Sequence, residues 1–155
     1  MTEFSLADLV RQLRPKLVVE LGTGDGMTGA AIMGALLDGA RFITVNWPNP
    51  PSGDNPARYL GPWLFDQRLT QLWGDTRDVS HLVPDGIDLL FIDSTHERGC
   101  AEAEWNLYRP KLKDGAVVVV DDLHHNDMLE FWDDLPGYDK RVVNDGRIGI
   151  LRHKC

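Results

Sequence analysis

The 155-residue sequence lacks the features that mark several classes of protein. Its two cysteines, Cys100 and Cys155, are too few for a disulfide framework and do not have metal-finger spacing. No apolar run approaches the ~20 residues of a membrane span, and the amino terminus has no signal-peptide pattern. Lysine and arginine form no cluster and the net charge is -8, which argues against a nucleic-acid backbone as partner. We therefore expect a cytoplasmic protein that binds neither nucleic acid nor membranes.

The residues that are present describe an ordinary globular chain, 43% hydrophobic and 26% charged, without repeats or linkers. Its length predicts one domain over residues 1–155. Short apolar runs predict strands at 17–19, 41–45, 69–73, 87–93 and 116–120. Helical patterns alternate with them at 6–13, 27–37, 76–82, 98–112 and 126–135, and a helix over 57–67 is interrupted by Gly61-Pro62.

The alternation of strands and helices predicts an α/β fold, a doubly wound and mainly parallel sheet. Segments 140–143 and 147–151, joined across Asn144-Asp145-Gly146, read as a hairpin. The hairpin brings the sheet to seven strands, of which one is antiparallel. The strand over 87–93 is mostly apolar and is therefore expected at the centre. Residues 46–56, with four prolines, predict a loop at a strand end, where open α/β sheets place their ligands.

Glu20 stands at the end of the first strand, and the turn behind it carries glycine at every second position from Gly22 to Gly26. Glycines at a strand-to-helix turn permit positive φ and let a ligand lie against bare main chain. A carboxylate beside them can accept hydrogen bonds from a ribose or an amine. A dinucleotide fingerprint would need its third glycine at Met27 instead. The pattern favours a nucleotide-like cofactor site, and a tight structural turn is the alternative.

The pattern Glu20-x-Gly22-x-Gly24-x-Gly26 resembles motif I of the class I S-adenosylmethionine-dependent methyltransferases. The order of the elements resembles the Rossmann-like fold of that family from the first strand to the last hairpin. The resemblance implies S-adenosyl-L-methionine as cofactor. It assigns the cofactor contacts to Glu20, Gly22, Thr23, Gly24, Asp25, Gly26, Asn46, Asp75, Thr76 and Asp93. Asn46 departs from the family, in which an acid at this position grips the ribose hydroxyls.

Three more carboxylates follow neighbouring strands, as Asp93 and the pair Asp121-Asp122. Such charges repel one another unless they are protonated or bridged by a cation, and an all-oxygen set suits Mg²⁺. The segments 91–96 and 119–122 resemble metal-dependent O-methyltransferases of the catechol and macrolide-sugar types. By that resemblance Asp93, Asp121 and Asp122 are the metal ligands. Aspartates that merely cap helices are the alternative.

His96 lies three residues after Asp93, where the related families carry a Lys or His general base. A neutral imidazole can take a proton from a hydroxyl that a metal has acidified, so the expected catalytic residues are His96 and Asp93. The alternative for His96 is a surface residue at a helix start.

The loop after residue 46 is similar to the substrate loop of the macrolide-sugar enzymes and of cephalosporin-hydroxylase-like proteins. The expected substrate contacts are Trp47, Tyr59, His124 and His125. Core or interface packing is the alternative for the aromatic residues, with Trp63 among them, and a polar loop is the alternative for the histidines.

The sequence therefore predicts an S-adenosylmethionine-dependent, Mg²⁺-assisted O-methyltransferase for a small hydroxylated acceptor, with a homodimer left open. Two alternatives stay open. One is a non-catalytic cofactor-binding or partner module of the same fold, and the other is a metal-dependent hydroxylase-like or hydrolytic protein. Only the residues up to Lys16 precede the first strand, whereas the resembled enzymes carry a longer amino-terminal cap over the substrate.

Overall fold

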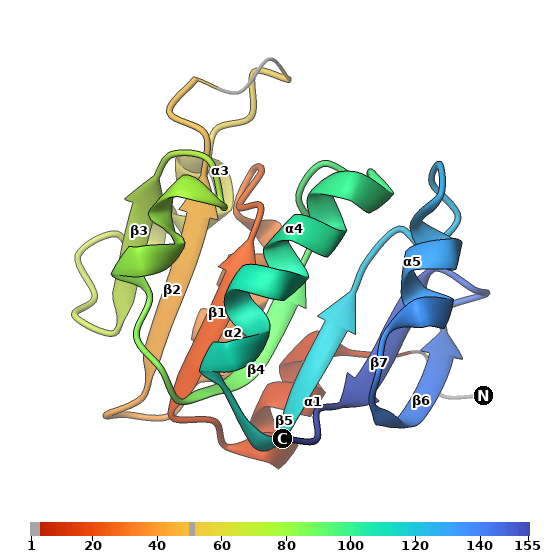
Figure 1. The fold of residues 1–155 in the computed structure, drawn as a ribbon. Helices are drawn as coiled ribbons and strands as arrows, with labels where there is room; N and C mark the ends of the chain where they lie inside the picture. The colour runs from red at the N-terminus through yellow and green to blue at the C-terminus, as the bar shows by residue number, and fades with distance from the viewer. Residues whose placement is uncertain (1–3, 50–51) are drawn as a thin grey trace.

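The computed structural model describes residues 4–49 and 52–155, and within them one mixed sheet runs through the molecule (Figure 1). Its seven strands lie in the order β3-β2-β1-β4-β5-β7-β6. They are β1 (Leu17–Leu21), β2 (Arg41–Asn46), β3 (Leu69–Trp73), β4 (Ile87–Ile92), β5 (Leu112–Val120), β6 (Tyr138–Val143) and β7 (Ile148–Arg152). β7 is antiparallel to both of its neighbours and the remaining pairs are parallel. The predicted fold class, the central β4 and the single antiparallel strand are confirmed.

Helices cover both faces of the sheet (Figure 1). One face carries α1 (Leu6–Leu13), α2 (Met27–Ala35) and α3 (Ala57–Leu60), and the other carries α4 (Arg98–Tyr108) and α5 (Met128–Asp134). Side chains alternate along each strand, so Val18 packs in the core under α1 and α2 while Val19 packs under α4 and α5. Because both faces are buried, the central strands read as continuous apolar runs.

Prolines and a positive φ angle account for three of the differences between predicted and observed helix bounds. α4 ends at Tyr108 and a 3₁₀ turn, Arg109–Lys111, follows with Pro110 at its start. Of the helix predicted over 57–67, only α3 forms, and it passes into a second 3₁₀ turn, Gly61–Trp63, after which no helix resumes within that described range. Asn126 has φ 47° and lies outside α5.

The other observed bounds differ from the predicted ones with no proline or unusual backbone angle in the described residues to explain the change. Asn46 is the last residue of β2, β5 already begins at Leu112, and α2 stops two residues early at Ala35. The helix expected at 76–82 is a 3₁₀ helix over Asp78–Leu82. Of the predicted loop, Pro50 and Pro51 lie outside the described residues.

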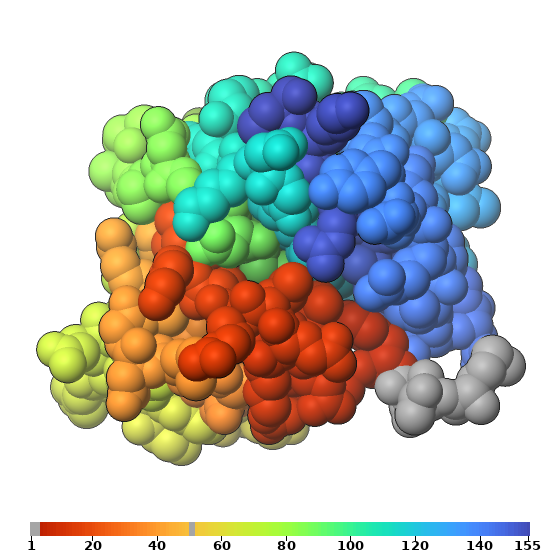
Figure 2. Space-filling view, turned by 90° about the horizontal axis from the view of Figure 1, so that it is seen from below, coloured from red at the N-terminus to blue at the C-terminus, as the bar shows by residue number. Residues whose placement is uncertain are grey.

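The two ends of the sheet differ. At the end where the parallel strands begin, seen in Figure 2, the carboxyl-terminal segment packs beside the segment that leads into β5. Asp88 accepts hydrogen bonds there from the backbone N–H groups of Lys16 at 2.7 Å and Leu17 at 2.9 Å. The opposite end bears the turns that carry the predicted site.

Among the helices of the described residues, none has the length and apolar character to cross a bilayer.

Candidate functional site

A cavity of about 710 Å³ opens at the carboxyl ends of β1 to β4. All predicted cofactor residues except Glu20 and Gly26 line it: Gly22, Thr23, Gly24, Asp25, Asn46, Asp75, Thr76 and Asp93. His96 and Trp47 line the same cavity. One space therefore joins the glycine-rich turn to the predicted catalytic pair.

Two of the three glycines in the turn are packed so closely against neighbouring backbone that a side chain would not fit, and the third faces open space. Gly22 has φ +102°, and a Cβ there would lie 2.0 Å from the carbonyl oxygen of Asp93. Gly26, with φ +84°, would bring a Cβ to 2.5 Å from the carbonyl oxygen of Pro56. At Gly24, φ is +52° and the Cβ position meets no atom within 4 Å, so this residue presents bare backbone to the cavity.

Glu20 lies inside β1 and is fully buried, so it is not a direct wall of the cavity. The Thr44 hydroxyl donates to its Oε2 at 2.5 Å, and the hydroxyls of Thr44 and Thr23 are 2.6 Å apart. Its Oε1 has no hydrogen-bond partner among the described residues. Burial raises the pKa of Glu20 to about 8, so the side chain is mostly uncharged at neutral pH.

Two predicted cofactor acids already hold the walls of the cavity together. Asp25 accepts from Arg58 at 2.5 Å and from the backbone N–H of Asn55 at 2.9 Å, which ties the loop before α3 to the glycine turn. Asp75 accepts from the Arg77 guanidinium through both carboxylate oxygens, and this bond lowers the pKa of Asp75. Both carboxylates are therefore already bonded to protein groups in the absence of a ligand.

Unlike these paired aspartates, Asn46 at the end of β2 has a side-chain nitrogen without a partner among the described residues. The residue is 9% exposed, and its Nδ2 finds no hydrogen-bond acceptor in the described part of the chain. A buried donor without a partner costs free energy, which a ligand oxygen can remove.

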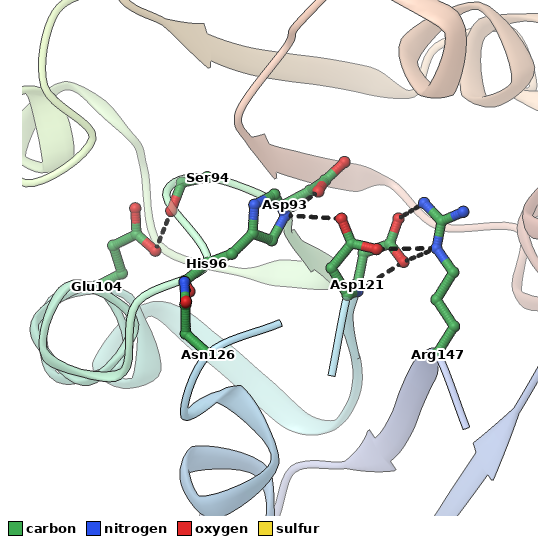
Figure 3. Close-up of polar contacts among 8 residues, drawn as sticks. Asp93, Ser94, His96, Glu104, Asp121, Asn126 and Arg147 are labelled. Carbon is green, nitrogen blue, oxygen red and sulfur yellow. Dashed lines mark hydrogen bonds and ion pairs between the residues drawn. The ribbon is translucent and has the colours of Figure 1, made fainter. Parts of the chain in front are cut away.

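Asp93, His96 and Asp122 come together at the β4 and β5 ends, and Figure 3 shows Asp93 and His96 of this group side by side. The Nε2 atom of His96 lies 2.9 Å from Asp93 Oδ1 and 3.3 Å from Asp122 Oδ2. The bond to Asp93 raises the pKa of His96, while burial raises the pKa of Asp93. One donor atom from each residue lies within 4.8 Å of the others, so the three can share a metal ion.

Asp121 stands apart from the ligand set predicted for it. Arg147, from the β6–β7 turn, binds both Asp121 oxygens, with Nε at 2.9 Å and Nη2 at 3.0 Å (Figure 3). The same Nε lies 3.1 Å from Asp122 Oδ1. The expected trio of Asp93, Asp121 and Asp122 is therefore replaced in geometry by Asp93, His96 and Asp122. No pattern in the sequence pointed to Arg147.

The predicted substrate residues are spread around the site. Trp47 lines the cavity and is half exposed, whereas the exposed Tyr59 does not line it. His125 lies with its ring 5.7 Å from that of His96, and His124 follows at 5.9 Å from His125.

Other cavity residues were missed by the sequence analysis: Arg77, Ser94, Cys100 and Glu104. Glu104 had a signal, because it lies on the α4 face whose other members, Ala101, Trp105 and Tyr108, are apolar and buried. An acid on such a face needs polar partners.

A family model described as a methyltransferase domain matches residues 19–123, about two thirds of the chain. The chain belongs to this methyltransferase family. The match confirms the methyltransferase family that the resemblance implied, and with it the expected enzyme class at the level of a methyltransferase. The matched region begins within β1 and ends just after the Asp121-Asp122 pair. No curated protein sequence matches the chain.

Solved structures share the fold. A methyltransferase from Geobacter sulfurreducens superposes with a TM-score of 0.76 at 18% identity, covering 97% of this chain and 76% of its own. The O-methyltransferase TomG from Streptomyces achromogenes, solved with SAM, gives 0.72 at 18% identity, covering 97% and 78%. The O-methyltransferase from Bacillus cereus, solved with SAH, gives 0.71 at 15% identity, covering 96% and 79%. At these identities the likeness establishes the fold.

Proposed function

We propose that this methyltransferase transfers a methyl group from S-adenosylmethionine to a hydroxyl of a small molecule, with His96 as the general base. One observation carries the proposal: a single cavity joins the glycine turn to the hydrogen-bonded pair of Asp93 and His96. The O-methyltransferases of similar fold, two of them solved with SAM or SAH, support the choice of oxygen as acceptor. The acceptor that we propose is a small hydroxylated molecule.

The residues of this chain fit the cofactor. Gly24 offers bare backbone, and Asn46 Nδ2 is a buried donor that a ribose hydroxyl would satisfy. Thr76 and Asp75 border the end of the cavity that we assign to the adenine. When bound, S-adenosylmethionine supplies an electrophilic methyl group.

His96 is built to receive the hydroxyl proton. Its Nε2 is engaged by Asp93, and no described residue bonds to its Nδ1, which leaves Nδ1 as the nitrogen that accepts. With S-adenosylmethionine bound, His96 Nδ1 would take the proton of the acceptor hydroxyl, while the cofactor would supply the methyl group and leave as S-adenosylhomocysteine. Asn126 donates to the backbone oxygen of His96 at 2.8 Å and so supports the loop that carries it.

A divalent cation is the second part of the proposal. Asp93, His96 and Asp122 would hold it, and a set that includes a nitrogen accepts Mn²⁺ as well as the expected Mg²⁺. When bound, the cation supplies positive charge that favours the ionised hydroxyl. A cation bound through His96 Nε2 would replace the hydrogen bond to Asp93 and leave the ring proton on Nδ1, so His96 would then be a ligand and not the base. Measuring metal dependence in the wild type and in His96→Ala distinguishes these two arrangements.

The test is methyl transfer from radiolabelled S-adenosylmethionine to a panel of catechols and hydroxylated sugars, with and without Mg²⁺ or Mn²⁺. The variant His96→Ala should lose about 100-fold or more in kcat, the contribution of a positioned base. It should keep its affinity for S-adenosylhomocysteine, measured by calorimetry. His81→Ala is the matched control, because that imidazole is exposed on the 3₁₀ helix before β4.

Two outcomes would contradict the proposal. Turnover of His96→Ala close to that of the wild type would remove His96 as the base. Binding of S-adenosylhomocysteine without transfer to any acceptor, under every cation condition, would make the chain a non-catalytic binding module. We further propose that residues 1–155 form a single domain. Sedimentation velocity would show whether two copies associate as a homodimer.

A further inference from the structure

Glu104 is an acid that the proposed reaction does not use. It lies in the middle of α4, is 1% exposed, and still borders the cavity. Its two oxygens accept from two hydroxyls, Thr76 Oγ1 at 2.5 Å and Ser94 Oγ at 2.9 Å (Figure 3 draws the second bond). Every hydrogen bond of this carboxyl group therefore goes to a side chain that also lines the cavity.

The two hydroxyls belong to different loops. Thr76 follows β3, and its backbone oxygen also accepts from the Tyr108 hydroxyl at 2.6 Å, one helical turn beyond Glu104. Ser94 follows β4 and directly succeeds Asp93. Glu104 thus ties the loop we assign to the adenine to the loop that carries the catalytic pair.

Packing alone does not explain why a carboxyl group stands at this position of α4. Burial of a carboxyl group costs free energy, and burial raises the pKa of Glu104 against the effect of its two hydrogen bonds. An apolar side chain would pack on this face as Ala101 and Trp105 do. Such a side chain would leave both hydroxyls without their acceptor and free to rotate, which would alter the cavity wall rather than the core.

We propose that Glu104 is a positioning residue for the cofactor, holding Thr76 and Ser94 so that the two loops present one preformed wall to the ligand. The inference rests on the proposed function, since it names S-adenosylmethionine as the ligand of this cavity. Preformed walls raise affinity because no side chain has to be ordered on binding.

The test is calorimetric titration of S-adenosylhomocysteine into the wild type, Glu104→Ala, Thr76→Val, Ser94→Ala and the double variant Glu104→Ala/Thr76→Val. Glu104→Ala should weaken binding by about ten-fold, the effect of one or two lost hydrogen bonds. The double variant should lose little more than Glu104→Ala, because both changes remove the same bond. Glu104→Gln should recover most of the affinity, since an amide can accept from one hydroxyl and donate to the other.

The matched control is Glu102→Ala on the exposed side of α4, which should bind as the wild type does. Urea unfolding of each variant without ligand separates stability from affinity. If Glu104→Ala does not fold, Thr76→Val and Ser94→Ala report the same bonds from their other ends. Wild-type affinity in Glu104→Ala, or in both hydroxyl variants, overturns this inference alone, as do losses that simply add. Failure of the wild type to bind would instead overturn the cofactor assignment.

Discussion

The carboxyl edge of the sheet holds two regions that are built by different means. The proposed cofactor region, at the ends of β1 to β3, consists of the glycine turn, the mostly uncharged Glu20, the Asn46 Nδ2 that has no acceptor in the described part of the chain, and two aspartates that pair with arginines in its walls. The reaction region, at the ends of β4, β5 and β7, consists of charged groups that pair with one another. Where a ligand would lie, the first region is shaped mainly by backbone conformation, with its ion pairs in the outer walls, whereas charged pairs make up the centre of the second.

This difference has a physical reason. An S-adenosyl cofactor needs close main-chain contact and neutral hydrogen-bonding groups, and glycine provides the first. A reaction centre needs charges of opposite sign held close together, so that a proton can move and charge can be stabilised. The regions meet at Gly22, where the turn touches the carbonyl of Asp93.

The largest expected effect is at that meeting point. Gly22→Ala would place a Cβ 2.0 Å from the Asp93 carbonyl oxygen, at a φ of +102° that alanine rarely adopts. We expect a loss of about 3 kcal/mol or more in the free energy of unfolding and loss of cofactor binding. Urea unfolding and calorimetry with S-adenosylhomocysteine measure the two effects.

Gly34→Ala is the control, because Gly34 lies in α2 with open space at its Cβ position. It should be neutral or gain up to about 1 kcal/mol from helix propensity. If the two alanine variants were equally stable, close packing at Gly22 would not be what joins the regions.

The next effect concerns pH and the uncharged acid of the cofactor region. The folded pKa of Glu20, about 8, is above the unfolded value of 4.5, so the folded state holds a proton that the unfolded state releases between these values. Stability should therefore fall as pH rises through this window, by at most about 1.4 kcal/mol per pH unit from this group. Glu20→Gln should flatten that slope in urea unfolding at pH 5, 6, 7 and 8.

His96 titrates with the same sign, because its folded pKa is also raised. Its contribution is common to the wild type and Glu20→Gln, so it cancels in the difference between their slopes. Glu102→Gln, on exposed α4 surface, should keep the wild-type slope. Equal slopes for all three proteins would mean that Glu20 is ionised at neutral pH.

In the reaction region, Arg147→Met removes the cation that pairs with Asp121, whose side chain is only 8% exposed. We expect a loss of about 1–2 kcal/mol in unfolding free energy, since a mostly buried carboxylate loses its partner while the arginine is half exposed. Millimolar Mn²⁺ should raise the melting temperature of this variant more than that of the wild type, because Asp121 becomes free to bind a cation.

Arg11→Met provides the comparison, because its pairing with Asp8 is exposed on both sides. Its expected loss is below about 0.5 kcal/mol. Equal losses from the two arginine variants would show that the reaction region is not held by this ion pair.

The smallest effect tests the departure from the family at the end of β2. Asn46→Asp should change cofactor affinity by about 1 kcal/mol, roughly five-fold, if residue 46 meets the ribose. Asn49→Asp, in the same cavity but more exposed, should change it less. Unchanged affinity in Asn46→Asp would move the ribose to another residue, with Asp54 of the cavity wall the first to try.

The cofactor region could be predicted well from the sequence because its signals are local. Alternating glycines behind a β-branched run specify a strand, a turn and a helix within a few residues, and the apolar periods specify the layers around them. Asn46 was expected directly after its strand and is in fact the last residue of β2, so the prediction was one residue from the observed bound. Glu20 was placed in the right strand but not in the right surroundings, because its contact with Thr44 joins two strands.

What only the tertiary structure decided is which polar groups pair. Arg147 reaches Asp121 across 26 residues, and Glu104 reaches Thr76 across 28, with no periodic signal linking either pair. The sequence by itself determined a methyltransferase fold with acids at its strand ends, because strand ends follow from local patterns. Which acid meets an arginine, a histidine or a hydroxyl depends on where the loops converge, and only packing of the whole sheet settles that.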